Sequence, residues 1–160
     1  MKATGIVRRI DDLGRVVVPK EIRRTLRIKE SDPLEIFTDR DGKIILKKYS
    51  PIGELGEFAK EYAQSLAQVS GYTVCIADHD QIIAASGKRA KEYAGRLIDE
   101  ELETVISNRK TVKLAKKEAV RLMQNDAGGY QSQVISVITS IGDCVGAVII
   151  FSDDGEKELG

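Results

Sequence analysis

The sequence predicts an α+β protein with two units, a small N-terminal one and a larger C-terminal one built on a central antiparallel sheet. The order of predicted elements points to this class, because short strands and a helix are followed by a long helix, a hairpin, further helices and antiparallel strands. The segment Tyr49-Ser50-Pro51 separates the two series as a short linker. The charge of the chain also changes sign there.

Basic residues dominate the first unit and acidic residues the second. Residues 1–50 contain thirteen Lys and Arg against eight Asp and Glu, whereas residues 51–160 contain twelve against seventeen. The formal net charge of zero therefore combines two units of opposite sign. A basic end joined to a second unit favours contact with a polyanion, and an ordinary solvated basic surface is the alternative.

The N-terminal unit begins with two predicted strands and a helix. β-Branched residues indicate strands over 4–10 and 15–18, joined by the turn Asp11–Gly14, whose glycine adopts a positive φ at low cost. Three consecutive valines in the second strand indicate burial on both of its faces. Pro19 then favours the first turn of a short helix over residues 20–28.

Two more strands, over 34–38 and 43–48, flank the hairpin turn signal Asp39–Gly42. A unit of this size encloses little core, and small domains of this kind need a metal, a disulfide or a partner. The sequence offers neither of the first two, so we expect an obligate homodimer through residues 1–50. Its core is predicted to consist of Val7, Val16, Val17, Val18, Leu26, Leu34, Ile36 and Ile45.

The C-terminal unit is predicted to begin with a long helix over 52–70, which Gly71 ends. Apolar residues recur along it at three- and four-residue steps and form one stripe, which includes Leu55, Phe58, Tyr62 and Leu66. Residues 116–125 fit neither helix nor strand. The other elements are predicted as strands over 72–77, 81–85, 111–114, 131–140 and 144–151 and helices over 88–93 and 99–107.

Catalysis, metal binding and membrane insertion are not predicted. His79 lies in a turn between two aspartates, where a solvated side chain is commoner than a catalytic base. Cys75 and Cys144 fall on apolar strands, where core packing and a neighbouring position in the sheet are expected. No apolar run is long enough to span a bilayer, and no signal peptide is visible. We therefore expect a cytoplasmic protein that is not an enzyme and holds neither a metal nor another cofactor.

The N-terminal residues are similar to the swapped-hairpin DNA-binding domain of AbrB-type transition-state regulators. The runs that carry the likeness are Thr4–Arg9, Asp12–Pro19, Glu21–Leu26, Glu35-Ile36 and Ile45–Tyr49. The resemblance implies a dimeric β-barrel of interleaved hairpins that binds double-stranded DNA. The DNA-binding residues that it implies are Arg8, Arg15, Arg23 and Arg24, with Arg9 and Lys20 as helpers.

The rest of the chain resembles the stage V sporulation protein T family of spore-forming bacteria, on the residues Ser50–Ile52, Glu54–Gly56, Phe58–Ala63 and Gly146–Ser152. This family joins the same DNA-binding unit to a C-terminal GAF-like domain. The resemblance implies a DNA-binding domain over 1–50, a linker over 51–53 and a GAF-like domain over 54–160. The family's domain closes with a long helix, but this chain ends soon after its last strand, so either the closing helix is absent or the sequence is truncated before it.

The resemblance implies regulation of sporulation genes, as activator or repressor. It also implies that the stripe residues Leu55, Phe58, Tyr62 and Leu66 belong to a helical interface, through which dimers assemble into a homotetramer. An unidentified small ligand in the GAF-like domain fits the sequence equally well. The alternative is an antitoxin of the same N-terminal fold, although such proteins carry a short disordered tail rather than a folded, apolar-rich unit.

The chemistry of the arginines agrees with DNA binding, because guanidinium forks suit phosphate groups and guanine edges and their binding releases counterions. Pairing with Asp11, Asp12 or Glu21 remains a competing role for one or two of them. No second helix is predicted beside residues 20–28, so a helix-turn-helix reader is not expected. We expect the surface to follow phosphate geometry and DNA deformability instead.

Overall fold

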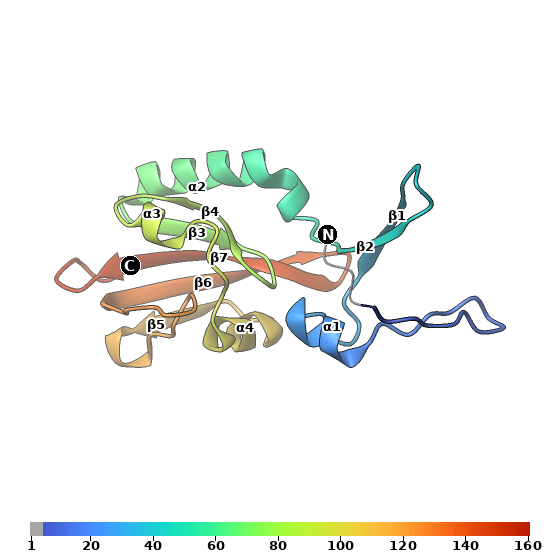
Figure 1. The fold of residues 1–160 in the computed structure, drawn as a ribbon. Coiled ribbons are helices and arrows are strands. Elements are labelled where there is room, and N and C mark those ends of the chain that lie inside the picture. The colour runs from blue at the N-terminus through green and yellow to red at the C-terminus, as the bar shows by residue number, and fades with distance from the viewer. Residues whose placement is uncertain (1–4) are drawn as a thin grey trace. The chain divides into compact units, whose positions relative to one another are not determined.

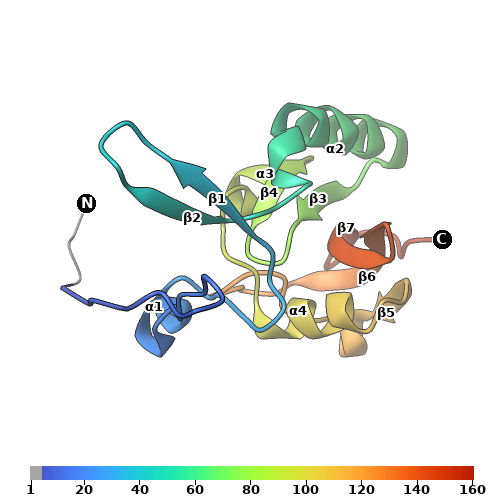
Figure 2. The same cartoon turned by 90° about the vertical axis from the view of Figure 1, so that its right-hand side faces the viewer.

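The computed structural model describes residues 5–160, and the chain divides into two compact units between Tyr49 and Ser50. Figures 1 and 2 show the elements of each unit from two directions. The N-terminal unit holds one short helix and one hairpin, whereas the C-terminal unit holds a large sheet with helices on both faces.

A short helix and a two-stranded hairpin are the regular elements of the N-terminal unit. Helix α1 spans Lys20–Thr25, and strands β1 (Leu34–Thr38) and β2 (Ile44–Lys48) pair antiparallel. The carboxylate of Asp39 closes the hairpin turn, because it accepts hydrogen bonds from the backbone N–H groups of Asp41 and Lys43, each at 2.9 Å. The predicted hairpin is confirmed.

The sequence pattern predicts that the first helix continues to Ile28, but helix α1 ends at Thr25. The backbone N–H of Ile28 donates to the carbonyl oxygen of Arg23 at 2.7 Å, and Arg27 adopts a positive φ of 55°. This arrangement is a Schellman ending, with an arginine in the position where glycine is usual. The apolar spacing continues past Thr25, but the backbone has already turned away from the helix axis.

The strands predicted over 4–10 and 15–18 are not formed: residues 5–18 contain no strand, and Thr4 lies outside the described residues. The turn between them is present, since the N–H of Asp11 donates to the Arg15 oxygen at 3.0 Å. A strand exists only where a second strand pairs with its backbone groups. The predicted burial of the valine run is also wrong for the single chain, because Val16 and Val17 are 49% and 69% exposed.

The C-terminal unit is built on a five-stranded antiparallel sheet with strand order β4-β3-β7-β6-β5. Its strands are β3 (Thr73–Ala77), β4 (Ile82–Ser86), β5 (Val112–Ala115), β6 (Tyr130–Ser140) and β7 (Asp143–Asp153). Its helices are α2 (Gly56–Ser70), α3 (Ala90–Tyr93) and α4 (Glu100–Ser107), with 3-10 turns over Gly53–Leu55 and Lys116–Glu118. The α+β class and the central antiparallel sheet are confirmed.

Helices cover both faces of this sheet and create two cores. Val74 and Ile76 of β3 pack in the cluster that includes Ala63 of α2, whereas Cys75 and Ala77 pack in the cluster beneath α3 and α4. Figure 1 shows α2 along one side of the sheet and α4 along the other. Because both faces are covered, every residue of β3 is buried.

Local signals set one end of each of the two longer helices, and the predicted end at Gly71 is confirmed. Gly71 follows α2 in a left-handed conformation with a φ of 76°, and its N–H donates to the Ala67 oxygen at 2.8 Å. The sequence predicts that this helix begins at residue 52, but Gly53–Leu55 form a separate 3-10 turn before it. The side chain of Asp99 caps α4 by accepting a hydrogen bond from the N–H of Glu101 at 3.0 Å.

Strands β6 and β7 form the longest hairpin of the unit, and Ile141 and Gly142 make its turn with φ values of 50° and 82°. Residues 116–125, which the sequence left unassigned, consist of a 3-10 turn followed by irregular backbone with one isolated bridge residue, Met123. No helix follows β7 within residues 154–160. None of the helices in the described part of the chain is long and apolar enough to cross a membrane.

Candidate nucleic-acid interface

Six basic side chains gather in a short stretch at the start of the N-terminal unit, before and on α1. These six residues, called the basic surface below, are exposed without exception: Arg8, Arg9, Arg15, Lys20, Arg23 and Arg24. Arg23 and Arg24 lie in the last turn of α1, where a positive charge is favourable because the carbonyl end of a helix is negative. The sequence predicts these six residues as the DNA-binding residues, and the structure leaves all six side chains exposed.

Arg15 is the member of the basic surface that forms an ion pair. Its Nε lies 2.8 Å from Oδ2 of Asp11, while Oδ1 of Asp11 accepts hydrogen bonds from the backbone N–H groups of Arg15 and Leu13. The backbone N–H and then the guanidinium of Arg15 lower the pKa of Asp11. The sequence leaves open that one or two of the arginines pair with a nearby acidic residue, and Arg15 does so with Asp11. The pair is exposed, so an incoming phosphate can replace the carboxylate at little cost.

Arg23 also has a partner, since its Nε donates to the carbonyl oxygen of Val18 at 3.1 Å and so ties α1 to the segment before it. The other four members, Arg8, Arg9, Lys20 and Arg24, make no side-chain hydrogen bond or ion pair within residues 5–160. No acidic side chain within residues 5–160 pairs with these four cations, which leaves them available to an external anion.

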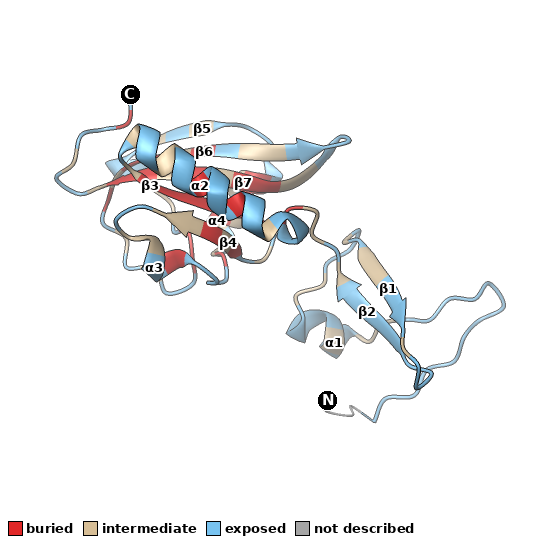
Figure 3. Ribbon diagram, turned by 90° about the horizontal axis from the view of Figure 1, so that it is seen from above, coloured by how far each residue is buried: buried red, intermediate tan, exposed pale blue. Residues whose placement is uncertain are grey.

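None of residues 5–49 is buried, and Figure 3 shows this unit without any residue in the buried class. Large apolar side chains are exposed throughout it, with Val7 at 85% and Leu13 at 71%. Among the described residues, Nη1 of Arg27 is a buried side-chain atom without a hydrogen-bond partner. A unit with exposed apolar surface and an unsatisfied buried donor is incomplete as a single chain.

The predicted dimer-core residues share this exposure. Val7, Val16, Val17, Leu26, Ile36 and Ile45 are exposed, and Val18 and Leu34 are half-buried. Sequence reasoning missed further exposed apolar side chains of the same unit, although their alternation with charged residues could have indicated them. These are Ile6, Ile10, Leu13, Phe37, Ile44 and Leu46.

The outer face of α2 carries the second exposed apolar group. Leu55 before the helix and Phe58 and Tyr62 on it are 53%, 61% and 65% exposed, whereas Ala59 and Ala63 face the sheet and are buried. Leu66, the fourth predicted member, is half-buried and packs against the inner cluster. Hence three of the four predicted interface residues point away from the core of their own unit.

The remaining candidate groups show no catalytic arrangement. Burial raises the pKa of Cys75 to about 12 and, more weakly, that of Cys144, so neither thiol is activated as a nucleophile. The expectation that they are sheet neighbours is wrong, because Cys75 lies opposite Ile149 and Cys144 opposite Thr139. His79 is exposed, and its Nε2 lies within hydrogen-bonding distance of the Cys144 oxygen. No cluster of metal-ligating side chains occurs among residues 5–160.

Comparison with known families gives two matches that meet near the linker. A family model described as stage V sporulation protein T C-terminal, transcription factor, matches residues 54–160. A second, described as antidote-toxin recognition MazE, bacterial antitoxin, matches residues 7–54. The first covers more than half of the chain.

Individual relatives agree with this division. Stage V sporulation protein T of Bacillus subtilis (strain 168) is 56% identical over 161 residues, which cover 99% of this chain and 90% of that protein. The transition state regulatory protein AbrB of the same organism is 69% identical over 51 residues, or 32% of this chain and 52% of AbrB. A solved DNA-bound structure of the N-terminal domain of AbrB is 69% identical, covers 32% of this chain and 91% of its own, and has a TM-score of 0.27.

Proposed function

The chain belongs to the stage V sporulation protein T family of transcription factors, and from this membership we infer how it regulates sporulation genes. It is a DNA-binding regulator and not an enzyme. The DNA-binding part is the N-terminal unit, which this chain shares with AbrB. An antitoxin role is not proposed, because residues 54–160 match the C-terminal part of the transcription-factor family.

We propose that two chains form one DNA-binding body through residues 1–50. The support is the absence of any buried residue among positions 5–49, together with apolar side chains that alternate along the segments before and after α1. Removing this surface from water favours association by about 25 cal/mol for each Å² buried. A second copy also supplies the strand partners that residues 5–18 lack within their own chain.

The basic surface is proposed to contact DNA phosphates. One observation carries this proposal: four of its six cations have no partner within residues 5–160, and the other two hold exposed contacts that a phosphate can replace. A dimer presents the surface twice, on a body in which the two copies are related by symmetry. Because α1 is short and lacks a companion helix, the complex is expected to follow DNA shape more than base identity.

The C-terminal unit is proposed to join dimers into larger assemblies or to sense a small ligand. The exposed side chains Leu55, Phe58 and Tyr62 favour assembly, because a stripe of this kind on a helix packs well against a second helix. Ligand sensing would place a small molecule within this unit, and assembly and sensing are compatible with each other.

The salt dependence of DNA binding tests the proposed contacts. Arg24→Ala in the full chain should weaken binding to duplex DNA and reduce the slope of log K against log salt by about two, since each of two copies loses one phosphate contact. Arg40→Ala is the matched control, because Arg40 is an exposed arginine of the same unit outside the basic surface. Fluorescence anisotropy over a range of NaCl concentrations measures both slopes.

An unchanged slope for Arg24→Ala, or an equal loss for Arg40→Ala, would remove the basic surface from the interface. Competition between AT-rich operator fragments and random duplex tests the mode of recognition. A specificity ratio above about 10⁵ would contradict recognition by shape, because values in that range are typical of strong readers of base sequence.

A further inference from the structure

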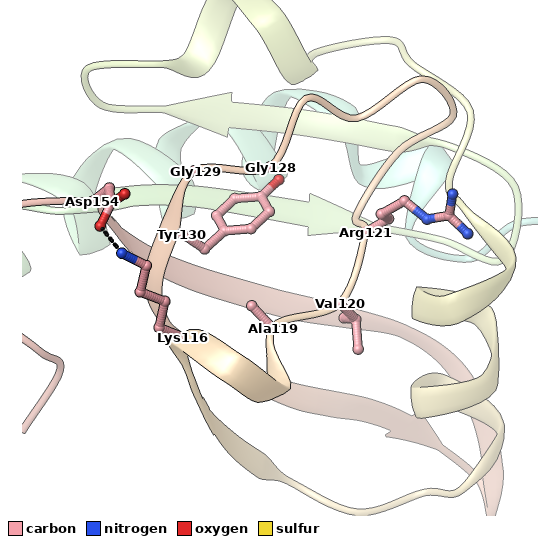
Figure 4. A pocket seen from close by; sticks show the side chains of 8 residues that line it. All are labelled: Lys116, Ala119, Val120, Arg121, Gly128, Gly129, Tyr130 and Asp154. Carbon is pink, nitrogen blue, oxygen red and sulfur yellow. Dashed lines mark hydrogen bonds and ion pairs between the residues drawn. The ribbon is translucent and has the colours of Figure 1, made fainter.

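A small pocket opens on the C-terminal unit between the 3-10 turn after β5 and the start of β6 (Figure 4). Its volume is about 270 Å³. The side chains of Ala119 and Tyr130 form its apolar interior, the Val120 side chain points away from them, and Lys116 and Asp154 lie at its edge. No sequence pattern points to this site, because its residues come from three separate segments.

The interior of the pocket is held in place by buried polar groups. The fully buried side chain of Gln133 binds the backbone of Val120 twice: its Oε1 accepts from the Val120 N–H at 2.9 Å, and its Nε2 donates to the Val120 oxygen at 2.8 Å. The Tyr130 hydroxyl donates to the carboxylate of Asp126 and lies 2.7 Å from the hydroxyl of Tyr93. The apolar interior is therefore preformed, which lowers the entropy cost of binding.

The edge of the pocket carries one positive and one negative group. Nζ of Lys116 lies 2.6 Å from Oδ1 of Asp154, and both side chains are more than half exposed. The backbone N–H of Asp154 donates to the Gly129 oxygen at 2.8 Å, which fixes the carboxylate beside the pocket. An exposed pair of this kind contributes little to stability, so a ligand can separate it at small cost.

We propose that this pocket binds a free α-amino acid with an apolar side chain. The carboxylate of the ligand takes the place of Asp154 beside Lys116, its ammonium group takes the place of Lys116 beside Asp154, and its side chain lies on Tyr130 and Ala119. This names the ligand class for the sensing role and rests on that part of the proposed function. Each charge of the ligand then meets an opposite charge, and the net charge of the site does not change.

Other ligand classes fit less well. A phosphate or dicarboxylate needs two cations, but Arg121 points away from the interior in Figure 4 and pairs with Asp99 and Glu101 of the α4 region at 3.7 and 3.4 Å. A drug-sized or nucleotide-sized molecule needs roughly 300–1,000 Å³, which exceeds the volume here. A small zwitterion with an apolar part matches the size, the charge pair and the interior together.

Isothermal titration calorimetry on the full chain tests the proposal with leucine and phenylalanine as probes. Isoamylamine and isocaproate, which keep the leucine side chain but carry one charge each, test the need for both charges. Either should bind about fivefold more weakly than leucine, the effect of losing one exposed ion pair of roughly 1 kcal/mol. Lys116→Met and Asp154→Asn should weaken leucine binding similarly, and Lys113→Met and Asp143→Asn are matched controls on exposed strand positions.

Ala119→Phe, which fills the interior, should abolish binding of both amino acids, and the thermal transition of the C-terminal unit verifies that this variant folds. A smaller filling variant, Ala119→Leu, replaces it if the transition is lost. The proposal is overturned if neither amino acid binds at millimolar concentration, if isocaproate or isoamylamine binds as tightly as leucine, or if leucine binding survives a folded filling variant. DNA binding measured on the same wild-type sample separates these failures from a failure of the DNA-binding function.

Discussion

Arg15 and Arg23 differ from the other cations of the basic surface, because each is already held by its own chain. The carboxylate of Asp11 keeps Arg15 beside the turn at residues 11–14, and the oxygen of Val18 holds Arg23 on the near side of α1. Both contacts are exposed and weak. Each contact holds one long side chain without neutralising the surface as a whole, and a phosphate that binds either guanidinium has to replace it.

Asp11→Asn should tighten DNA binding by about two- to fivefold, the size expected for release of one exposed ion pair. The lowered pKa keeps Asp11 charged at neutral pH, so in the wild type its charge competes with phosphate for Arg15. Asparagine keeps an oxygen for the N–H groups of Leu13 and Arg15 and so preserves the turn. Anisotropy titrations against the same duplex measure the change. Weaker binding would mean that Asp11 positions Arg15 rather than competing for it.

Gly146 shows how one missing side chain allows close packing in the C-terminal unit. A Cβ on this residue would lie 2.1 Å from the Ala77 oxygen and 2.7 Å from Cδ1 of Ile52. The first of these is a backbone atom of the neighbouring strand β3 and cannot move aside. Gly146→Ala should therefore destabilise the C-terminal unit by about 3 kcal/mol, the upper part of the range for overpacking.

Gly56→Ala is the control for this substitution, because a Cβ on the first residue of α2 meets nothing within 4 Å. It should leave stability unchanged or raise it by up to about 1 kcal/mol, since alanine favours the helix. Calorimetric unfolding of the full chain measures both. Equal stability of the two variants would show that the β3–β7 contact relaxes around an added methyl group.

The exposed charge of the arginines could be predicted from the sequence, because a charged side chain on a short basic segment is normally solvated. The hydrogen-bond partners of individual polar residues could not be predicted in this way. Gln133 and Asp78 look like surface residues in the sequence, yet both are buried, and each is bound to backbone groups of a distant or adjoining loop. Such burial depends on the tertiary packing of loops, for which no periodicity exists.

The linker is fastened to the C-terminal unit by one buried carboxylate in the turn between β3 and β4. Oδ2 of Asp78 accepts a hydrogen bond from the Ser50 hydroxyl at 2.9 Å, and its Oδ1 accepts from the N–H groups of Asp80 and Gln81, each at 2.8 Å. The Ser50 oxygen in turn accepts from the N–H of Gly53. The first residues of this unit are thereby fixed at the point from which the chain continues towards the DNA-binding unit.

Asp78→Ala should lower the stability of the C-terminal unit by about 2–3 kcal/mol, because three hydrogen bonds to a buried carboxylate are lost together. Amide hydrogen exchange should accelerate at Gly53, Asp80 and Gln81 in particular. Asp143→Ala is the control, an exposed aspartate at the start of β7. Uniform acceleration across the unit, without a local effect at these amides, would contradict a fastening role for Asp78.

Elements that pair within their own chain were predicted well from the sequence, and elements that need an outside partner were not. The hairpin over residues 34–48 and the strands β6 and β7 carry both their apolar pattern and their turn residues in one segment. Residues 5–18 have the strand pattern as well, but the chain provides no strand to pair with them. The apolar pattern of a segment shows that it can form a strand, and a strand forms only where a second strand pairs with it.

The two units of the protein differ in how complete they are as single chains. The C-terminal unit has two apolar clusters of buried residues, whereas no residue among positions 5–49 is buried. The small size of the first unit predicts this need for a partner from the sequence alone. The exposed apolar stripe of α2 favours association of the second unit as well. The assembled protein would therefore have one contact between chains in each unit.

Replacing the stripe with charge tests the second of these associations. If dimers assemble into the proposed homotetramer through the stripe, Phe58→Glu combined with Tyr62→Glu should reduce it from four chains to two, because a carboxylate within an apolar helix contact must lose its water without gaining a partner. Both side chains are more than half exposed, so the C-terminal unit itself should keep its stability. Gln64→Glu is the control on α2, two residues from Tyr62 and therefore on another face.

Light scattering with and without duplex DNA measures the mass of each variant. The proposed dimer through residues 1–50 should persist in the double variant, so one dimer should still bind DNA. Binding to two neighbouring sites on one fragment should lose its cooperativity. This follows because linking two DNA-binding dimers raises the effective concentration of the second at its site. If the double variant keeps the wild-type mass, the stripe of α2 is not the contact between dimers; if it becomes monomeric, the two associations depend on each other.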